Sequence, residues 1–345
     1  MTLSEMQATA TKRTEAIIGA WTKQPTGMIE KSIEAYKKAY EDIDKKLQKV
    51  ILTLDGVAPE NRMNELIKYN RLSNLKKEAK AAYDAAAKIN ASNQALMSRT
   101  AITNKYYGNM YSVNWLTEDY FKYIDQKAVE VSIFGTPEVW DSIKTANAPK
   151  YMPYQPQYGT LIDILTKNRT EDILKLNAAI TQGLIQGTSY AKVSKEIKSI
   201  LNTSANKSLR IARTEGNRNL NAGAFANTQA ALESGIEMQR QYVATLDTRT
   251  REQSGSMDGQ TVNADEPFTY PNGVQTMIVG NSGVPRYDIN DRCTSIDIIP
   301  GFEPTLRRGR DPVTGENEII SYKSFDDWIK EKGLKYNKSG LLVEA

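Results

Sequence analysis

The sequence predicts a mostly helical α+β protein, with a long N-terminal helical hairpin, a central helical block and a small C-terminal α+β domain containing an antiparallel sheet. Apolar residues recur three and four positions apart over residues 29–54 and 72–89, the spacing that puts them on one side of a helix. Beyond Gly235 apolar residues partly alternate with polar ones, which indicates a strand with one buried face. The expected domains are 1–155 (hairpin), 156–235 (helical block), 236–303 (β-containing) and 304–345 (C-terminal extension).

The hairpin is predicted from a narrow apolar seam on each of two helices, a pattern typical of coiled-coil packing. The seam consists of Ile29, Ile33, Tyr36, Tyr40, Ile43, Leu47, Val50 and Leu54, followed by Leu72, Leu75, Ala79, Ala82, Ala86 and Ile89. Gly56 and Pro59 predict the turn between the helices, and Pro25 with Gly27 predicts a break before the first helix.

Residues 105–158 are rich in aromatic side chains. Aromatic residues interleaved with lysine are able to stack single-stranded bases, but more often they pack a core or a protein interface, and we favour packing. Thr117 predicts the cap of a helix that runs to about residue 131. Pro153 and Pro156 predict a domain boundary, since a helix cannot continue through both.

The helical block is expected to contain four helices, over residues 161–165, 173–184, 190–201 and 207–233. Gly183, Gly187 and Asn202 separate them, and Ser189 is suited to cap the third. The last helix carries Arg213-Thr214-Glu215, which we interpret as part of an ion-paired helix docked on the following sheet.

The C-terminal part is expected to contain one strand over residues 236–246 and another over 293–299, with irregular structure between them. Asp247 follows the first strand and is expected to accept hydrogen bonds from backbone amides, or from Arg249 and Arg251. Farther on, residues 314–322 predict a hairpin arm, and Ser324 predicts the cap of a short helix docked by Phe325, Trp328 and Ile329.

The composition excludes several classes of enzyme. The chain has no histidine, which removes Ser-His-Asp and Cys-His nucleophiles and almost all zinc sites. One cysteine, Cys293, excludes an internal disulfide framework and fits a reducing cytoplasm. No apolar run approaches the ~20 residues of a membrane span, and residues 1–20 lack the pattern of a secretory signal. We expect no cofactor and no membrane partner.

Positive charge gathers on the second helix of the hairpin, in Lys68, Arg71, Lys76, Lys77, Lys80 and Lys88. One interpretation is an ordinary solvated helix face, because lysine is a common exposed residue. The other is a surface that faces double-stranded DNA, because clustered lysine and arginine bind phosphates without regard to base sequence. The block over residues 167–218 is basic as well.

Five pieces of sequence, in this order and spacing, resemble the Mu-F-like family of phage head morphogenesis (minor head) proteins. They are the segment 210–215 with its Arg213-Thr214-Glu215, the segment 246–251 with Asp247, Arg249 and Thr250, the pair Asp258-Gly259, the segment 266–268, and the segment 288–294 with Arg292-Cys293. The resemblance covers about a quarter of the chain. It implies a structural role for these motif residues.

The resemblance also implies a function. It suggests a minor head protein that is no enzyme, bound to the portal on the capsid interior, contacting scaffold or major capsid protein and acting in head assembly and genome packaging or delivery. Its location would be the virion, after assembly in the host cytoplasm. Relatives carry histidine or cysteine where this chain has Ser254 and Asp291, so the resemblance leaves only Cys293 of a possible metal or disulfide staple.

Two alternatives stay open at this point. Asp247, Asp258, Asp288, Asp291 and Asp297 could gather around a magnesium ion and make a nuclease, although aspartate beside glycine or asparagine is usually a turn residue. The chain could also be a non-specific DNA-binding protein without a portal role.

Overall fold

The computed structural model describes residues 3–117, 161–186, 188–299 and 303–345. Their contacts divide the chain into two compact units. The helical unit comprises Gln24–Met97 and Gly159–Ala212, and the β-containing unit comprises Met1–Lys23, Ser98–Tyr158 and Arg213–Ala345. The mostly helical α+β class is confirmed. Each unit is made of segments that alternate along the chain with those of the other unit, whereas the predicted domains are consecutive segments. The four predicted domains stay a prediction.

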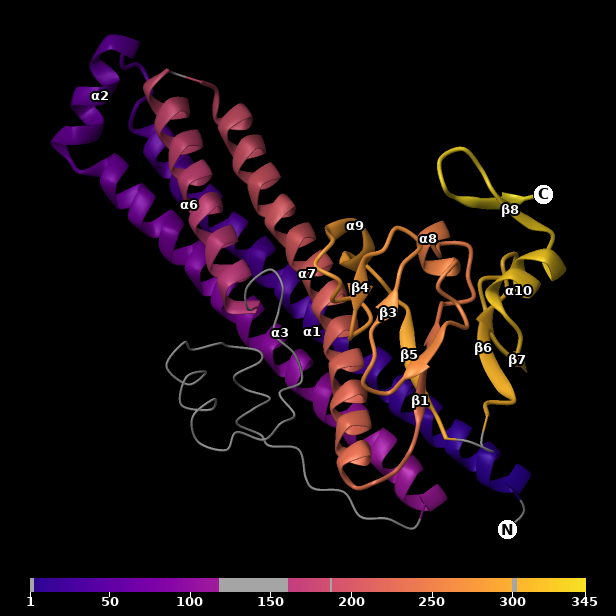
Figure 1. Cartoon of the computed structure of the whole chain (residues 1–345). Coiled ribbons are helices and arrows are strands. Elements are labelled where there is room, and N and C mark those ends of the chain that lie inside the picture. Colours follow the sequence, from indigo (N-terminus) through magenta and orange to yellow (C-terminus); the bar gives the residue numbers. More distant parts are fainter. Residues whose placement is uncertain (1–2, 118–160, 187, 300–302) are drawn as a thin grey trace. The chain divides into compact units, whose positions relative to one another are not determined.

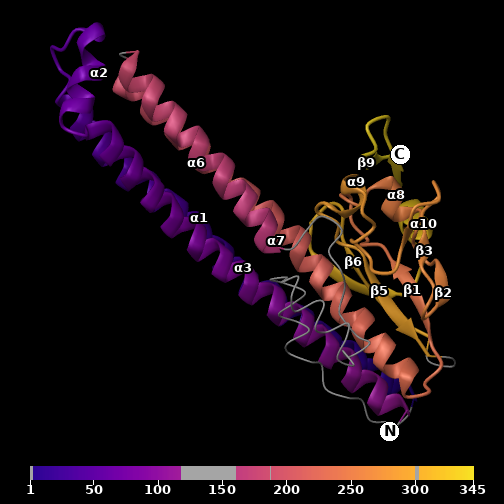
Figure 2. The same cartoon turned by 60° about the vertical axis from the view of Figure 1, so that its left-hand side comes forward.

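In residues 3–117, 161–186 and 188–233, which the structure describes, the helices are α1 (Leu3–Leu52), α2 (Pro59–Lys68), α3 (Arg71–Thr117), α6 (Leu161–Ile185) and α7 (Tyr190–Glu233). Within the helical unit α1, α3, α6 and α7 run side by side, and α2 lies at their far end (Figures 1 and 2). The apolar core is formed by Tyr36, Ile43, Leu47, Leu54, Leu66, Leu75, Ala79, Tyr83, Ala86, Leu176, Ile180, Val193 and Ile197, among others.

Most of the predicted seam belongs to this core, including Leu54 at the end of its first helix, but some of its residues do not. Ile43 and Leu47 are fully buried, whereas Ile33 is 42% exposed and Ile89 46% exposed. The physical reason is that an ideal α-helix drifts by about 20° per heptad relative to a strict seven-residue repeat, so residues toward one end of a long seam rotate out of the contact.

Several predicted helix boundaries were wrong. Residues 24–27 lie inside α1, because one proline removes a single hydrogen bond from a helix of 50 residues. The expected turn at 55–59 leads into α2, a short helix that begins at Pro59. The four expected helices of the central block are two, α6 and α7.

Gly183 does not end a helix, and the reason is packing. It lies within α6, where an added Cβ would come within 2.4 Å of a methyl group of Val193. Asn202 lies exposed inside α7, where asparagine costs only a fraction of a kcal/mol, about 0.7 at most. Ser189 directly precedes α7, and its carbonyl oxygen accepts hydrogen bonds from the amides of Lys192 and Val193.

The β-containing unit is built around an antiparallel sheet with the order β2-β1-β5, in which β1 is Gln239–Val243, β2 is Thr261–Asn263 and β5 is Thr294–Ile298. The predicted alternation is confirmed. One face consists of the buried residues Ile236, Met238, Arg240, Tyr242, Ala244 and Leu246, and none of the residues between them is buried. The strand itself is shorter than residues 236–246.

The stretch between β1 and β5 is not irregular, contrary to expectation. It contains α8 (Glu252–Gly255), strand β2, the short pair β3 (Phe268–Thr269) and β4 (Gln275–Thr276), and α9 (Pro285–Asp288). These elements were missed because each is only two to four residues long. Elements this short are fixed by contacts distant in sequence and leave no detectable periodicity.

Residues 304–345 form two hairpins and a helix. The hairpins are β6 (Leu306–Arg310) with β7 (Asn317–Ser321), and β8 (Leu334–Tyr336) with β9 (Leu342–Glu344). The expected capped helix is confirmed as α10 (Phe325–Glu331), in which the amide of Asp327 donates to Ser324 Oγ at 3.1 Å. Phe325 and Trp328 share one apolar core with Tyr242, Met257, Phe268, Tyr270, Tyr287 and Cys293.

Some expectations fall on residues outside the described part. These are the helix expected from Thr117 to about 131, most of the aromatic-rich stretch and the boundary at Pro153 and Pro156. Thr117 itself is the last residue of α3, and Tyr106 is buried. Among the described helices, none is long and apolar enough to cross a membrane.

Candidate functional site

The carboxylate of Asp247 holds the turn that follows β1. It accepts a backbone hydrogen bond from Arg249 at 2.9 Å and one from the Arg249 side chain at 3.2 Å, as expected. Arg292 supplies a second guanidinium, with Nη2 at 2.7 Å from Oδ1 and Nη1 bonded to Oδ2. Burial alone would raise the pKa of Asp247, but the bonds and charge of Arg292 and Arg249 hold it below its usual value.

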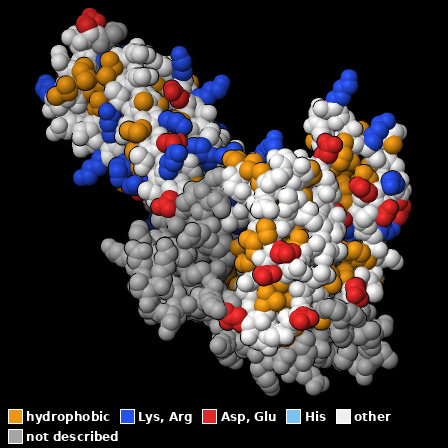
Figure 3. Space-filling model, viewed as in Figure 1, with side chains coloured by type: hydrophobic (Ala, Val, Ile, Leu, Met, Phe, Trp, Pro, Cys, Tyr) orange, Lys and Arg blue, Asp and Glu red, His pale blue; other side chains and the backbone are white. Residues whose placement is uncertain are grey.

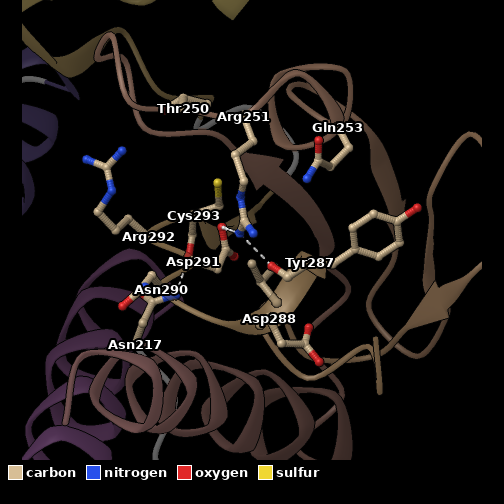
Figure 4. A network of polar contacts seen from close by, with 12 residues as sticks. Asn217, Thr250, Arg251, Gln253, Tyr287, Asp288, Asn290, Asp291, Arg292 and Cys293 are labelled. Carbon is tan, nitrogen blue, oxygen red and sulfur yellow. Dashed lines mark hydrogen bonds and ion pairs between the residues drawn. The ribbon is translucent and has the colours of Figure 1, made fainter. Parts of the chain in front are cut away.

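Arg251 does not bind Asp247, contrary to expectation. Its guanidinium donates to the carbonyl oxygens of Tyr287, at 2.7 Å, and Arg286, and lies 3.5 Å from Asp291 Oδ1 (Figure 4). Asp291 is 3% exposed, and burial raises its pKa despite the nearby Arg251. Burial, with the charge of Asp291, also raises the pKa of the Cys293 thiol. A thiol in these surroundings is a poor nucleophile.

Asp258 joins four segments through one carboxylate. It accepts from the Ala244 amide at 2.7 Å, from the Phe325 amide at 2.7 Å and from both terminal nitrogens of Arg307 at 2.8 and 2.6 Å. Both side chains of the ion pair are almost fully buried, and Arg307 also donates to the carbonyl oxygen of Lys323. Gly259, next in the chain, has a φ of +79°, which favours glycine at this turn.

Arg307 was not recognised as a site residue, because the sequence placed it in a basic cluster, residues 307–310. The cluster is strand β6, in which Arg307 and Gly309 are buried while Arg308 and Arg310 are exposed. Strand alternation separates Arg307 and Gly309 from Leu306, Arg308 and Arg310, but the apolar Leu306 lies on the other face, so no signal in the sequence points Arg307 inward.

The Arg213-Thr214-Glu215 triplet lies on α7, and its members behave differently. Thr214 Oγ1 accepts from the Asn290 amide at 3.0 Å, and Glu215 accepts from Arg218 Nη1 at 2.6 Å. Arg213 is exposed. Thr214 thus fixes α7 to the loop before β5, Glu215 pairs with Arg218 on the same helix, and Arg213 takes no part in the described bonds.

Three further residues of α7 strengthen that attachment and were missed. Arg218 Nε donates to the Gly280 carbonyl at 3.0 Å, while the side-chain amides of Asn217 and Asn221 donate to the Cys293 carbonyl at 3.1 and 3.0 Å. The signal in the sequence was the i, i+4 spacing of the two asparagines, which places both on one side of the helix.

The buried Arg240 and the half-buried Asp297 occupy opposed positions on β1 and β5. Arg240 donates to the Met277 carbonyl at 2.5 Å and to that of Glu266, and its guanidinium lies 4.7 Å from the ring centre of Phe225. Burial lowers the pKa of Arg240 to about 10. Asp297 accepts from Thr228 Oγ1 at 2.6 Å and from Asn109 at 3.3 Å, and burial raises its pKa.

The five aspartates considered for a metal site each have separate partners. The fifth of them, Asp288, accepts from the amides of Ser282 and Gly283 at 2.9 and 3.0 Å. Within residues 3–117, 161–186, 188–299 and 303–345, no group of three or more potential metal ligands comes together.

Ser254, Asp291 and Cys293 do come together. They line one cavity of about 20 Å³ with Thr245, Thr250 and the three arginines Arg249, Arg251 and Arg292. A polar cavity of this size accommodates about one water molecule. The positions at which the family resemblance implies histidine or cysteine therefore meet in space, although their present side chains do not make a zinc site.

The six residues proposed to face DNA are spread over α2 and α3, with Lys68 on α2. Lys68, Lys77, Lys80 and Lys88 are exposed, whereas Arg71 and Lys76 are half-buried. Lys80 lies 2.7 Å from Asp84, and Arg71 lies 3.7 Å from Glu65. Two of the six therefore have a carboxylate partner, and their DNA-facing role stays a prediction.

Comparison with known protein families finds one matching family model. Residues 174–296 match the model of the family described as Phage Mu protein F like protein. These residues form a Mu F-like segment. The segment contains every family-motif residue named above, but Arg307, the partner of Asp258, lies beyond its end. No solved structure matches the chain.

Three curated relatives were compared. Minor head protein GP7 of Bacillus phage SPP1 is 35% identical over 173 residues, which are 50% of this chain and 56% of GP7. The NAD(+)--arginine ADP-ribosyltransferase EFV of Enterococcus faecalis is 33% identical over 175 residues, 51% of this chain and 35% of that protein. An uncharacterized protein of Haemophilus influenzae is 26% identical over 178 residues, 50% of this chain and 36% of its own length. The chain thus spans about half the length of GP7 and about a third of the other two.

Proposed function

We propose that this protein is a minor structural protein of the head of a tailed bacteriophage and not an enzyme. The observation that carries the proposal is the Mu F-like segment, together with the similarity to a relative named as a minor head protein. The geometry supports a structural role, because the motif residues Thr214, Glu215, Asp247, Asp258 and Arg292 are engaged in bonds that hold the fold.

We propose further that the protein associates with the portal on the capsid interior, acts in genome packaging or delivery, and contacts scaffold or major capsid protein during assembly in the host cytoplasm. The test is reconstitution with purified components. Co-sedimentation with portal oligomers supports this part of the proposal, and failure to co-sediment at any salt concentration refutes it.

Contact with genomic double-stranded DNA is a separate part of the proposal. Over its whole length the helical unit carries 21 Lys and Arg against 14 Asp and Glu, which leaves a charge of +7. Binding through such a surface is weak, indifferent to base sequence and steeply dependent on salt. Figure 3 shows blue side chains over the helical part of the chain.

The DNA contact is tested by replacing Lys76, Lys77 and Lys80 together with glutamine. We expect lower affinity on every DNA sequence and a flatter salt dependence, because each lost phosphate contact reduces counterion release. The matched control replaces Lys37, Lys38 and Lys45, three exposed lysines of α1. An equal loss of DNA affinity in the two triple variants indicates a general charge effect. No loss of affinity in the α3 variant indicates that the α3 lysines are only a solvated helix face.

The similarity to a named ADP-ribosyltransferase is the observation that favours an enzyme. It covers only 35% of that relative, and two of the cavities lined by described residues measure about 20 Å³, far below the ~300 Å³ or more typical of small-molecule sites. We expect no NAD consumption with arginine-containing acceptors and no metal-dependent cleavage of plasmid or linear DNA. Turnover that survives repurification contradicts the structural proposal.

A further inference from the structure

A buried aspartate lies in the helical unit and joins three of its helices. Asp172 of α6 is 2% exposed. Tyr83 of α3 and Ser204 of α7 donate to its Oδ2 at 2.9 and 2.6 Å, and Lys207 of α7 donates to its Oδ1 at 3.2 Å. A carboxylate has about four lone-pair sites, so these three donors leave one site on Oδ1. A further donor is favoured there, because a buried charge is costly unless its hydrogen bonds are complete.

Asp172 lines a polar cavity of about 20 Å³. Four helices supply the walls of this cavity, which include Tyr36 of α1, Asn90 of α3, Asp172 of α6 and Ser208 of α7. Its volume exceeds the ~10–15 Å³ that a water molecule needs and is far below the ~300 Å³ or more of small-molecule sites. The cavity therefore admits a ligand of about one non-hydrogen atom.

Asn90 is a second buried polar residue of the cavity with unused bonding capacity. Its side chain is 2% exposed, and its Oδ1 accepts from Gln94 Nε2 at 2.9 Å. Within the described part of the chain, no group accepts a hydrogen bond from Asn90 Nδ2. A buried amide donor without an acceptor is destabilising, so folded proteins normally supply one. The residues that line the cavity thus offer one free acceptor site and one free donor.

The charges that line the cavity decide which class of ligand fits. Lys207 pairs with Asp172, and Arg169, which also lines the cavity, donates to Asp84 Oδ1 at 2.7 Å. A cation would meet Lys207 and Arg169, whereas an anion would meet the carboxylate of Asp172, and burying like charges together is unfavourable. A neutral molecule that both donates and accepts hydrogen bonds avoids both penalties. At this volume that molecule is water.

We propose that this cavity is a binding site for one water molecule, which donates to Asp172 Oδ1 and accepts from Asn90 Nδ2. The water completes a polar layer to which α1, α3, α6 and α7 all contribute, inside a unit whose core is otherwise apolar. It is a shared partner of α3 and α6, so a shift of either helix along the other breaks one of its bonds. The site therefore fixes the alignment of these two helices.

A crystal structure of the full chain tests the site directly. We expect one water in the cavity, within about 2.7–3.2 Å of both Asp172 Oδ1 and Asn90 Nδ2. A cavity without water, a water that does not bond to both residues, or an ion in its place overturns the proposal. Soaks with bromide and with rubidium identify an ion, because both elements scatter anomalously.

Deuteron magnetic relaxation dispersion tests the same site in solution, because it counts water molecules that exchange slowly. Asn90→Leu replaces the amide by an apolar side chain of similar size, and we expect the count to fall by one. The matched control is Asn206→Leu, the same replacement at an exposed asparagine of α7, which should leave the count unchanged. An unchanged count in Asn90→Leu, or an equal fall in the control, contradicts the proposal. If thermal unfolding shows that Asn90→Leu does not fold, the crystal structure of the parent still decides.

Discussion

The contacts that stabilise the helical unit internally differ in kind from those that stabilise the β-containing unit internally. In the helical unit a seam of apolar side chains repeats along α1 and α3, and α6 and α7 pack against it. In the β-containing unit an apolar core is supplemented by arginines that bridge distant segments, such as Arg218 to Gly280 and Arg307 to Asp258. Buried arginine is tolerated only with partners, because an unpaired buried charge costs several kcal/mol.

This difference predicts which substitutions each unit tolerates. A repeated apolar seam distributes the free energy of unfolding over many similar contacts. The loss caused by a substitution in the seam therefore follows the burial of the residue that is replaced. A buried arginine that joins distant segments makes several hydrogen bonds with one side chain. Its loss therefore leaves a carboxylate and several carbonyl groups without their donors at once. Four substitutions test this comparison, from the largest expected effect to the smallest, and a fifth, Asp247→Asn, supplies the contrast for the last of them.

Ile43→Asp should destabilise the helical unit most. Ile43 is fully buried in the seam, and an aspartate there has no partner, so we expect a loss of about 4 kcal/mol or more in the free energy of unfolding. Ile33→Asp is the control on the same predicted seam, because Ile33 is 42% exposed and should lose little. Urea unfolding followed by circular dichroism measures both, and equal losses would show that burial does not decide the effect.

Arg307→Met should destabilise the β-containing unit by about 3 kcal/mol, since it leaves the buried carboxylate of Asp258 without its guanidinium. Arg308→Met changes the exposed neighbour on β6 and should stay within about 0.5 kcal/mol. Thermal unfolding of the two variants measures the difference. A melting temperature of Arg307→Met equal to that of Arg308→Met contradicts the importance of this bridge.

Gly223→Ala should destabilise by about 2 kcal/mol, the middle of the cost of overpacking. An added Cβ at Gly223 of α7 would lie 2.4 Å from the backbone oxygen of Ile102 of α3, and a backbone atom cannot rotate away. Gly27→Ala is the control. Gly27 lies inside α1 with nothing within 4 Å of its Cβ position, so alanine should stabilise there by about 0.5 kcal/mol. Opposite signs in calorimetry confirm the contact, and equal signs contradict it.

Asp291→Asn should change the free energy of unfolding least, and the change should depend on pH. Burial raises the pKa of Asp291 above its ordinary 3.8, so protonation favours the folded state, and this contribution is lost as the pH rises through the folded pKa. Asparagine stays neutral, so we expect a gain in the free energy of unfolding near neutral pH that vanishes toward acid.

At Asp247 the pH dependence of stability has the opposite sign. Its pKa is lowered, so its contribution is present above the unfolded pKa and is lost as the pH falls through the folded pKa. Asp247→Asn should therefore destabilise at neutral pH and approach the parent in acid. Unfolding free energies of both variants across the acid range measure the two slopes, and slopes of the same sign would refute the assignment.

The sequence was informative where structure repeats with a short period. The alternation from Ile236 to Leu246 correctly predicted a buried face, and the seam around Ile43 correctly predicted the helical core. The same reasoning failed at Pro25 and Asn202, because the packing and length of a long helix outweigh one unfavourable residue.

The bonds of the β-containing unit were predicted only where both partners lie close in the chain. Asp247 with Arg249 was expected and found, whereas Asp247 with Arg292 spans 45 residues and was not. Which arginine reaches which carboxylate depends on how the strands are brought together, and no local pattern records it. The bond between Arg307 and Asp258 is a further case, because strand alternation divides β6 into two faces without saying which face is buried.

The most direct test of the proposed function is the composition of purified virions of the phage that encodes this chain. Full heads separated from tails should contain the protein at far fewer copies than the major capsid protein, and quantitative mass spectrometry of the two fractions measures this. Recovery with heads at low and constant copy number is the result predicted for a minor head protein. Absence from heads, with the protein left entirely in the soluble lysate, contradicts it.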